Sequence, residues 1–185
     1  MLFRSDVLQV GCILNTFIRR SDVVKIACIA QLVNVIAPIM TEPKGAAWRQ
    51  TIFYPYYFAS VFGRGAALQL AVKSPGYDAD VADNVPYLDI SGVHDEEAGT
   101  LTFFAVNRHG AETLDLAVAL QGFDNATLID HQAMTHANLE AANTLKDMHA
   151  VGPTKGSGAA VVDGALNAKL PPYSYQMYRL SVSET

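Results

Sequence analysis

The stretch Val23–Pro43, VVKIACIAQLVNVIAPIMTEP, constrains the fold of this 185-residue chain most strongly, because it is almost entirely apolar. Such a run is typical of a membrane-spanning helix, a buried helix, or a strand covered on both faces. A spanning helix needs about 20 mostly apolar residues, and here Lys25, Gln31 and Pro38 interrupt the run. Its β-branched start, VVKIACIA, instead predicts a parallel strand buried on both sides.

Helical patterns flank this strand. In Asp6–Arg20, DVLQVGCILNTFIRR, apolar residues recur at three- and four-residue spacing, which predicts a helix with Asp6 as its N-cap. The aromatic segment RQTIFYPYYFASVFG predicts a second helix that ends at Gly63. The residues between the strand and this second helix contain Pro38, Pro43 and Gly45, so we expect a long loop there.

From Ala66 onward the pattern changes to short alternating segments, separated by turn residues at intervals of roughly 8–12 residues. This spacing is typical of an antiparallel sandwich or barrel. We expect hairpin connections at Asp95–Gly99 and Asn107–Glu112, and a long surface loop at Asn143–Gly158. The strand candidates are ALQLAVKSP, VPYLDISGVHDE, TLTFFAVNRH, TLDLAVALQGF, ATLIDHQAM, GAAVVDGALNAKLPP and SYQMYRLSVS.

Composition narrows the range of functions. The net charge is -5 and the basic residues are scattered, which argues against a nucleic-acid partner. The histidines show no HxH, CxxC or HExxH spacing, and GxSxG does not occur, so we expect no metal site, no cofactor and no serine nucleophile. Cys12 and Cys28 both lie in apolar sequence and are expected to pack as free thiols.

Several polar residues are candidates for a site. Gln31 follows the predicted parallel strand, where α/β folds bind their ligands, and its amide suits paired sugar hydroxyls; capping of loose backbone is the alternative. Trp48 either walls a sugar face or packs in the core. Glu42 lies in the same loop but alone cannot supply both an acid and a nucleophile. Asp95–Glu97 lie in a predicted turn, where exposed carboxylates are ordinary.

Residues Val24–Gly65, VKIACIAQLVNVIAPIMTEPKGAAWRQTIFYPYYFASVFGRG, closely resemble the C-terminal third of bacterial α-L-arabinofuranosidases of glycoside hydrolase family 51. The resemblance continues through YDADVADNVPYLDISGVHDEE, LTFFAVNRH, ANTLKD and LPPYSYQMYRL, and so covers nearly the whole chain after Asp6.

The resemblance implies an α/β part plus an all-β part: the end of a (β/α)8 barrel, then an antiparallel β-sandwich of jelly-roll type. The barrel part spans residues 6–63 and the sandwich residues 66–185. Val24–Ala30 then corresponds to the eighth barrel strand, with barrel helices at Asp6–Arg20 and Thr51–Phe62.

The family removes non-reducing terminal α-L-arabinofuranosyl groups from arabinan, arabinoxylan and arabino-oligosaccharides, with retention of configuration. One Glu is the acid/base and a second is the nucleophile. These belong to NEP- and EWN-type motifs on the fourth and seventh strands, and neither motif occurs here, since Thr41 precedes Glu42-Pro43. The resemblance therefore assigns no catalytic residue to this chain. It makes Gln31 a substrate-binding residue and puts Asn34 and Trp48 next to the site.

Three interpretations follow. The first is a C-terminal fragment of a cytoplasmic α-L-arabinofuranosidase that is inactive alone and belongs to a homo-oligomer, often a hexamer in this family. The helical periodicity that begins directly at Asp6 agrees with a fragment. The second is a non-catalytic β-sandwich module for carbohydrate binding or oligomer contacts. The third is a divergent complete enzyme that uses Glu42 with one of Asp95–Glu97.

Overall fold

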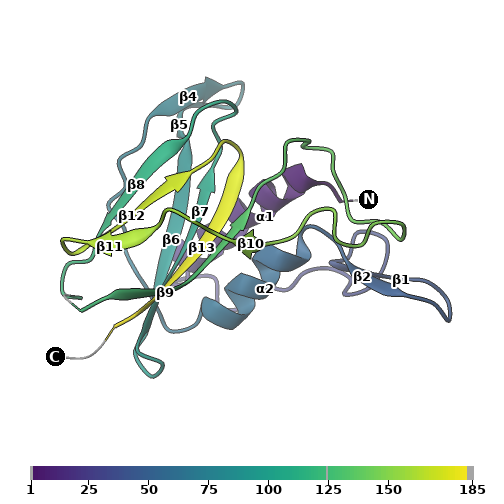
Figure 1. Cartoon of the computed structure of the whole chain (residues 1–185), viewed down its shortest axis with the longest axis horizontal. Coiled ribbons are helices and arrows are strands. Elements are labelled where there is room, and N and C mark those ends of the chain that lie inside the picture. Colours follow the sequence, from purple (N-terminus) through teal and green to yellow (C-terminus); the bar gives the residue numbers. More distant parts are fainter. Residues whose placement is uncertain (1, 124, 183–185) are drawn as a thin grey trace.

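The computed structural model of the chain describes residues 2–123 and 125–182, which form three layers. Two helices cover one face of a six-stranded sheet, and a three-stranded sheet covers the other (Figure 1). This arrangement confirms the antiparallel β-sandwich that the alternating segments predict.

Both predicted helices are present. Helix α1 spans Arg4–Arg19, and α2 spans Phe53–Phe62 and ends at Gly63 as expected. The predicted N-cap at Asp6 is wrong, because α1 begins two residues earlier. Asp6 occupies the third helical position instead, where its carboxylate accepts the backbone N–H of Phe3 at 2.6 Å.

The six-stranded sheet runs in the order β10-β9-β13-β7-β6-β3, and the three-stranded sheet in the order β11-β12-β8. All pairings in both sheets are antiparallel. The first sheet comprises β3 (Ala66–Ala67), β6 (Leu88–Asp95), β7 (Thr100–Asn107), β9 (Thr127–Met134), β10 (Thr154–Lys155) and β13 (Ser174–Ser181). The second comprises β8 (Leu114–Ala119), β11 (Ala160–Val162) and β12 (Ala165–Leu170).

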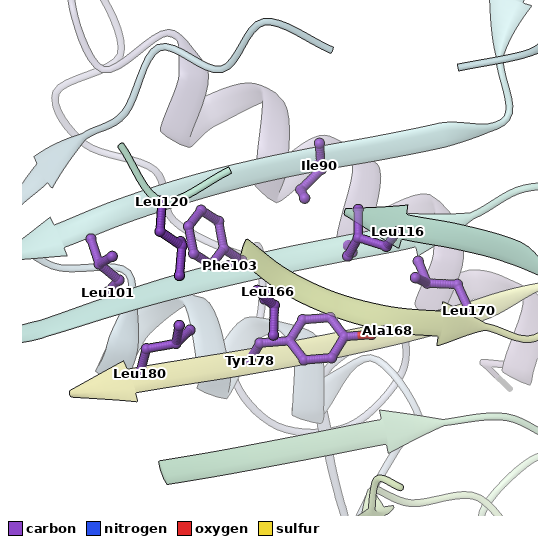
Figure 2. Close-up of a cluster of buried hydrophobic side chains, with 11 residues drawn as sticks. Ile90, Leu101, Phe103, Leu116, Leu120, Leu166, Ala168, Leu170, Tyr178 and Leu180 are labelled. Carbon is purple, nitrogen blue, oxygen red and sulfur yellow. The ribbon is translucent and has the colours of Figure 1, made fainter. Parts of the chain in front are cut away.

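The main core lies between the two sheets (Figure 2). Strand β7 shows why the sequence folds this way: all eight of its residues are buried. Successive side chains of a strand point to opposite faces, so Leu101 and Phe103 enter the core between the sheets, whereas Phe104 and Val106 face the helices. This strand is therefore covered on both sides, by the second sheet on one face and by the helices on the other.

The second core joins the helices to the sheet. Val7 of α1 and Phe58 of α2 pack in one cluster with Tyr175 of β13. Gly11 allows α1 to approach the sheet closely, because a Cβ atom at this position would lie 2.8 Å from Tyr175 Cδ2. The predicted barrel helices and the sandwich thus share one packed core.

The predicted strand at Val24–Ala30 is not present. These residues take no regular secondary structure, and most of them are exposed. A strand forms only by hydrogen bonding to a neighbouring strand, and among the described residues no strand pairs with this segment. Cys28 is consequently exposed rather than packed, whereas Cys12 is partly buried.

The predicted loop after this segment contains a small antiparallel ribbon of β1 (Ile39–Thr41) and β2 (Ala47–Arg49). Figure 1 shows this ribbon at one end of the molecule, away from the sandwich strands. Pro43 and Gly45 are its turn residues, so they mark a hairpin rather than an unstructured loop. A second ribbon, β4 (Gly76–Ala79) with β5 (Ala82–Pro86), lies beside the sandwich.

Of the two predicted hairpin connections, one is correct. The turn within Asp95–Gly99 joins the paired strands β6 and β7. Asn107–Glu112 instead carries the chain from β7 in one sheet to β8 in the other. The Asn107 amide donates to the backbone oxygens of Glu112, Leu170 and Pro171 at 2.9, 2.9 and 3.0 Å, which fixes this crossing.

The segment Asn143–Gly158 is largely loop, as predicted, but two-residue β10 lies inside it. The first residue of the segment, Asn143, is only 2% exposed. The start of the segment is therefore packed inside the protein and not at its surface. Within the described part of the chain, no helix is both long and apolar enough to cross a membrane.

Candidate functional site

Gln31 lies within the largely exposed segment that follows α1, directly after residues 24–30. Its side chain is exposed and its backbone lies in the left-handed region, with φ 57°. A residue other than Gly rarely adopts this conformation, so the chain turns sharply here. The amide of Gln31 is free to meet a ligand, and its role in substrate binding stays a prediction.

Asn34 organises the loop beyond Gln31. Its Oδ1 accepts the backbone N–H of Thr41 at 2.8 Å, and its Nδ2 donates to Thr41 Oγ1 at 3.0 Å. Its own N–H donates to Ile39 O at 2.7 Å. These bonds fasten the loop to strand β1, so Asn34 shapes the loop beside Gln31.

Trp48 lies on β2, directly opposite Met40 of β1. Its ring is partly buried, and Nε1–H donates to the backbone oxygen of Asn143 at 3.2 Å. The β1–β2 ribbon thus carries Trp48 and, through Thr41, holds Asn34. Both predicted site residues are thus linked to the same small ribbon, Trp48 as part of it and Asn34 through its hydrogen bonds to Thr41.

Two buried amides fix the ribbon to the rest of the molecule, and the sequence analysis missed both. Asn143 donates to Arg49 O at 2.9 Å and to Val151 O at 2.8 Å, and accepts Val151 N–H at 2.7 Å. Gln50, 2% exposed, donates to Ala37 O at 2.9 Å and accepts Leu2 N–H at 3.0 Å. No local pattern marks these residues, because their partners are far away in sequence.

An apolar groove of about 530 Å³ lies between α1, α2 and residues 24–30. Ile13 and Phe17 of α1 line it from one side, and Tyr56 of α2 from another. Large side chains in and beside it remain exposed: Ile13, which lines it, is 44% exposed, and Ile26 in the adjoining segment is 85% exposed. Monomeric proteins rarely leave a contiguous apolar surface of this kind uncovered.

The candidate carboxylates do not form a catalytic pair. Glu42 is exposed at the turn of the β1–β2 ribbon, and Asp95–Glu97 lie at the β6–β7 turn of the sandwich. Figure 1 shows that the ribbon stands apart from the sandwich strands. A retaining glycosidase holds its two carboxyl groups about 5–5.5 Å apart, so the third interpretation of the sequence is wrong.

Other reactive groups are equally unsuited to catalysis. Burial raises the pKa of Cys12 to about 12, so its thiol stays protonated. Burial also lowers the pKa of His131, whose Nε2 lies 2.6 Å from Gln176 Oε1 inside the protein. Among the residues that the structure describes, no group of His, Cys, Asp and Glu is arranged to hold a metal ion.

Comparison with known proteins identifies the family. Residues 3–174 match the model of the alpha-L-arabinofuranosidase C-terminal domain. An intracellular exo-alpha-(1->5)-L-arabinofuranosidase from Halalkalibacterium halodurans is 47% identical over 175 residues, which cover 95% of this chain and 35% of that protein. A relative of the same name from Bacillus subtilis is 44% identical, with the same coverage.

Comparison with solved structures supports the same family assignment. A family 51 alpha-L-arabinofuranosidase from Bifidobacterium longum superposes with a TM-score of 0.90 at 33% identity, covering 97% of this chain and 34% of that one. The Thermotoga maritima enzyme, solved as an arabinose complex, shares the fold with a TM-score of 0.81 at 21% identity. The chain spans about a third of the length of these relatives, 35% of the first two. It belongs to the family of α-L-arabinofuranosidase C-terminal domains.

Proposed function

We propose that this chain is the C-terminal part of a retaining exo-α-L-arabinofuranosidase that releases terminal arabinofuranosyl groups from arabinan, arabinoxylan and arabino-oligosaccharides. In this proposal residues 6–63 complete a (β/α)8 barrel and residues 66–185 form its supporting sandwich. The match of residues 3–174 to the family of C-terminal domains carries the proposal. The names of the relatives supply the reaction.

The exposed apolar face supports this role. The surface of α1 and residues 23–36 has the composition of a protein interior, because its exposed side chains are large and aliphatic or aromatic. They are Ile13, Phe17, Val23, Ile26, Leu32, Val33, Val35 and Ile36. The earlier strands and helices of a barrel would bury this face, and would supply the parallel neighbours that residues 24–30 need to form a strand.

Gln31 is the substrate-binding residue in this proposal. The C-terminal ends of barrel strands carry the active site, and Gln31 directly follows the segment proposed as the eighth strand. Its amide offers two donors and an acceptor to the hydroxyls of an arabinofuranose. Asn34 and Trp48 hold the adjoining loop and ribbon, so they position this wall of the pocket.

The acid/base and the nucleophile lie outside this chain in the proposed enzyme. The chain is therefore inactive alone, and its contribution is measurable only within a complete barrel. We further propose a cytoplasmic location, which the word intracellular in the relatives' names supports. A homo-oligomeric assembly of the complete enzyme is part of the same proposal, and light scattering of that enzyme tests it.

A hybrid enzyme tests the proposal. Residues 3–182 replace the matching third of the Halalkalibacterium halodurans relative, and hydrolysis of 4-nitrophenyl α-L-arabinofuranoside is measured. We expect the hybrid to be active. Gln31→Ala should lower kcat/KM by a factor that corresponds to a loss of about 1–3 kcal/mol in transition-state binding. Gln69→Ala, an exposed amide in the β domain, is the matched control.

Two results would contradict the proposal. A folded hybrid without activity would favour the second interpretation, a non-catalytic module for carbohydrate binding or oligomer contacts. An unchanged kcat/KM for Gln31→Ala would remove Gln31 from the pocket while leaving the assignment of the enzyme intact.

A further inference from the structure

A second, chemically different pocket lies at the end of the sandwich where α1 begins. Its volume is about 590 Å³, and its walls come from the first turns of α1, the β4–β5 ribbon and the loops that precede β6, β8 and β13. Aromatic rings dominate it. They belong to Tyr77, Tyr87, His109 and Tyr173.

Three of these rings form a continuous row. The Tyr77 and Tyr87 rings stack with centroids 4.9 Å apart and planes inclined by 26°. The His109 and Tyr87 ring centroids lie 4.3 Å apart, with the planes inclined by 57°, so Tyr87 contacts both of the other rings. All three side chains are only partly buried, so the row is a rigid aromatic wall that still reaches solvent.

His109 presents a defined polar edge to this wall. Its Nδ1 accepts the backbone N–H groups of Glu112 at 2.7 Å and Ala111 at 3.1 Å. A ring nitrogen that accepts two hydrogen bonds carries no proton, so in the neutral ring Nε2 is the donor. Nε2 lies 3.8 Å from Glu112 Oε2, beyond hydrogen-bonding distance, and is available to a ligand oxygen.

Arg108 adds unused donors. Asp89, the carboxylate nearest to its guanidinium, already accepts Arg19 at 3.0 Å and Asn15 at 2.8 Å. Arg108 Nη2 reaches the same carboxylate only at 4.0 Å, and Arg108 Nε is buried without a hydrogen-bond partner among the described residues. A buried donor without a partner is costly, but this Nε atom itself is closed to solvent. A ligand in the pocket would instead meet the exposed part of the Arg108 side chain, which is 25% exposed overall.

The backbone of the pocket is also specialised. Tyr173 has a φ of 45°, a strained value for a bulky residue. Its ring packs on Gly110, where a Cβ atom would lie 2.8 Å from the Tyr173 hydroxyl oxygen. Backbone strain of this kind persists only where the surrounding structure imposes it. Here the packing against Gly110 fixes the position of the Tyr173 ring in the wall of the pocket.

We propose that this pocket, the aromatic row Tyr77–Tyr87–His109 with Arg108 and Tyr173, binds one unit of an oligosaccharide as an accessory site outside the barrel. Aromatic faces provide apolar contact to a sugar ring, and the Arg and His donors bind its oxygens. Helices of a (β/α)8 barrel begin at the end that carries the active site, and the pocket contacts Ser5 and Gln9 in the first turns of α1. The pocket therefore lies near the same end, where it would retain a chain whose terminus is being cleaved.

The inference rests on the proposed function only for the direction of that opening and the choice of sugars. Binding to the 185-residue chain is measured by isothermal titration and NMR with linear α-(1→5)-arabinopentaose, and separately with xylopentaose. We expect saturable millimolar or tighter binding of at least one sugar. Tyr77→Ala, which removes the outer ring of the row, should weaken the binding about tenfold or more.

Matched variants identify the pocket. Tyr57→Ala removes an exposed tyrosine on α2, and Gln31→Ala removes the proposed barrel contact; both should leave the affinity unchanged. Tyr77→Trp keeps an aromatic face and should retain binding, which separates ring loss from misfolding if Tyr77→Ala is unstable. Since no catalysis is measured, an inactive hybrid enzyme does not affect the outcome.

The proposal is overturned if neither sugar binds the folded chain. It is also overturned if Gln31→Ala abolishes the binding while Tyr77→Ala does not change it, because the sugar would then occupy the barrel site.

Discussion

Asn143 is the residue that most clearly links distant parts of the chain. Its buried amide makes three hydrogen bonds, which hold Arg49 at the end of β2 and Val151 in the loop before β10. Its backbone oxygen accepts Trp48 Nε1–H. One side chain thus fixes the position of the ribbon that carries a predicted site residue.

We expect Asn143→Ala to lower the free energy of unfolding by about 2–3 kcal/mol, because it leaves buried backbone groups of Arg49 and Val151 without partners. Urea unfolding followed by circular dichroism measures this change. Gln121→Ala, at an exposed turn, is the control and should cost less than about 0.5 kcal/mol. Equal losses in the two variants would contradict the role of Asn143.

His131 makes stability depend on pH. It is 6% exposed, burial lowers its pKa below the usual 6.5, and Tyr178 donates to the same Gln176 oxygen at 2.6 Å. The unfolded chain therefore binds a proton more readily than the folded one, so the stabilisation is complete above about pH 6.5 and is lost as pH falls toward the lower folded pKa. Urea unfolding at about pH 7.5, 6.5 and 5.5 should show this loss, and it should be smaller in His131→Asn. Parallel pH profiles would contradict it.

At the scale of elements, alternation in the sequence predicted the strands of the sandwich well. The segments that became β6, β7, β9 and β13 carry their own burial pattern, because a strand with one or both faces covered must show it in its residues. The crossing at Asn107–Glu112 was not predictable in this way. Its direction depends on the hydrogen bonds of Asn107 to the backbone oxygens of Leu170 and Pro171, which lie 63 and 64 residues further along the chain.

For residues 24–30, by contrast, the sequence pattern predicted a strand that the structure does not contain. Their sequence predicts a parallel strand, yet hydrogen-bonding neighbours decide whether a strand forms, and a local pattern does not contain them. Gln31 was likewise predicted as a site residue from its place after this strand. Asn143 and Gln50 escaped prediction because a buried amide has no local signature.

We expect trypsin to cleave early after Lys25, because the residue is exposed in a segment without regular secondary structure. Mass spectrometry of early digestion products identifies the cut. Lys169 is also exposed but is paired within β12, so it should resist cleavage. In the hybrid enzyme the cut after Lys25 should become slow; equally fast cleavage there would argue against a barrel strand.

At the scale of the whole molecule, the apolar side chains between the two sheets are buried, whereas several of those beside the helices are exposed. The exposed surface around α1 and residues 23–36 is called the open face below. The two sheets enclose their core, whereas the groove beside α1, α2 and residues 24–30 leaves large side chains in solvent. The isolated chain should therefore associate with itself through this face. In the proposed enzyme the earlier barrel units take that place.

Ile26→Lys tests this expectation, because Ile26 is 85% exposed on the open face. Sedimentation velocity should show concentration-dependent association of the unmodified chain, and weaker association of the variant. Val81→Lys, where Val81 is 95% exposed at the turn of the β4–β5 ribbon, is the control and should associate like the unmodified chain. A chain that stays monomeric throughout would show that the open face does not drive association.

The core shared by α1, α2 and the sheet also bears on how such enzymes can be recombined. Gly11 and Tyr175 approach so closely that a helix from another relative would meet a differently shaped surface. A crossover at residues 64–65, the proposed boundary between barrel and sandwich, would separate the helices from the sheet on which they pack. A crossover before Arg4 would transfer both helices together with this sheet, so that their contacts are kept.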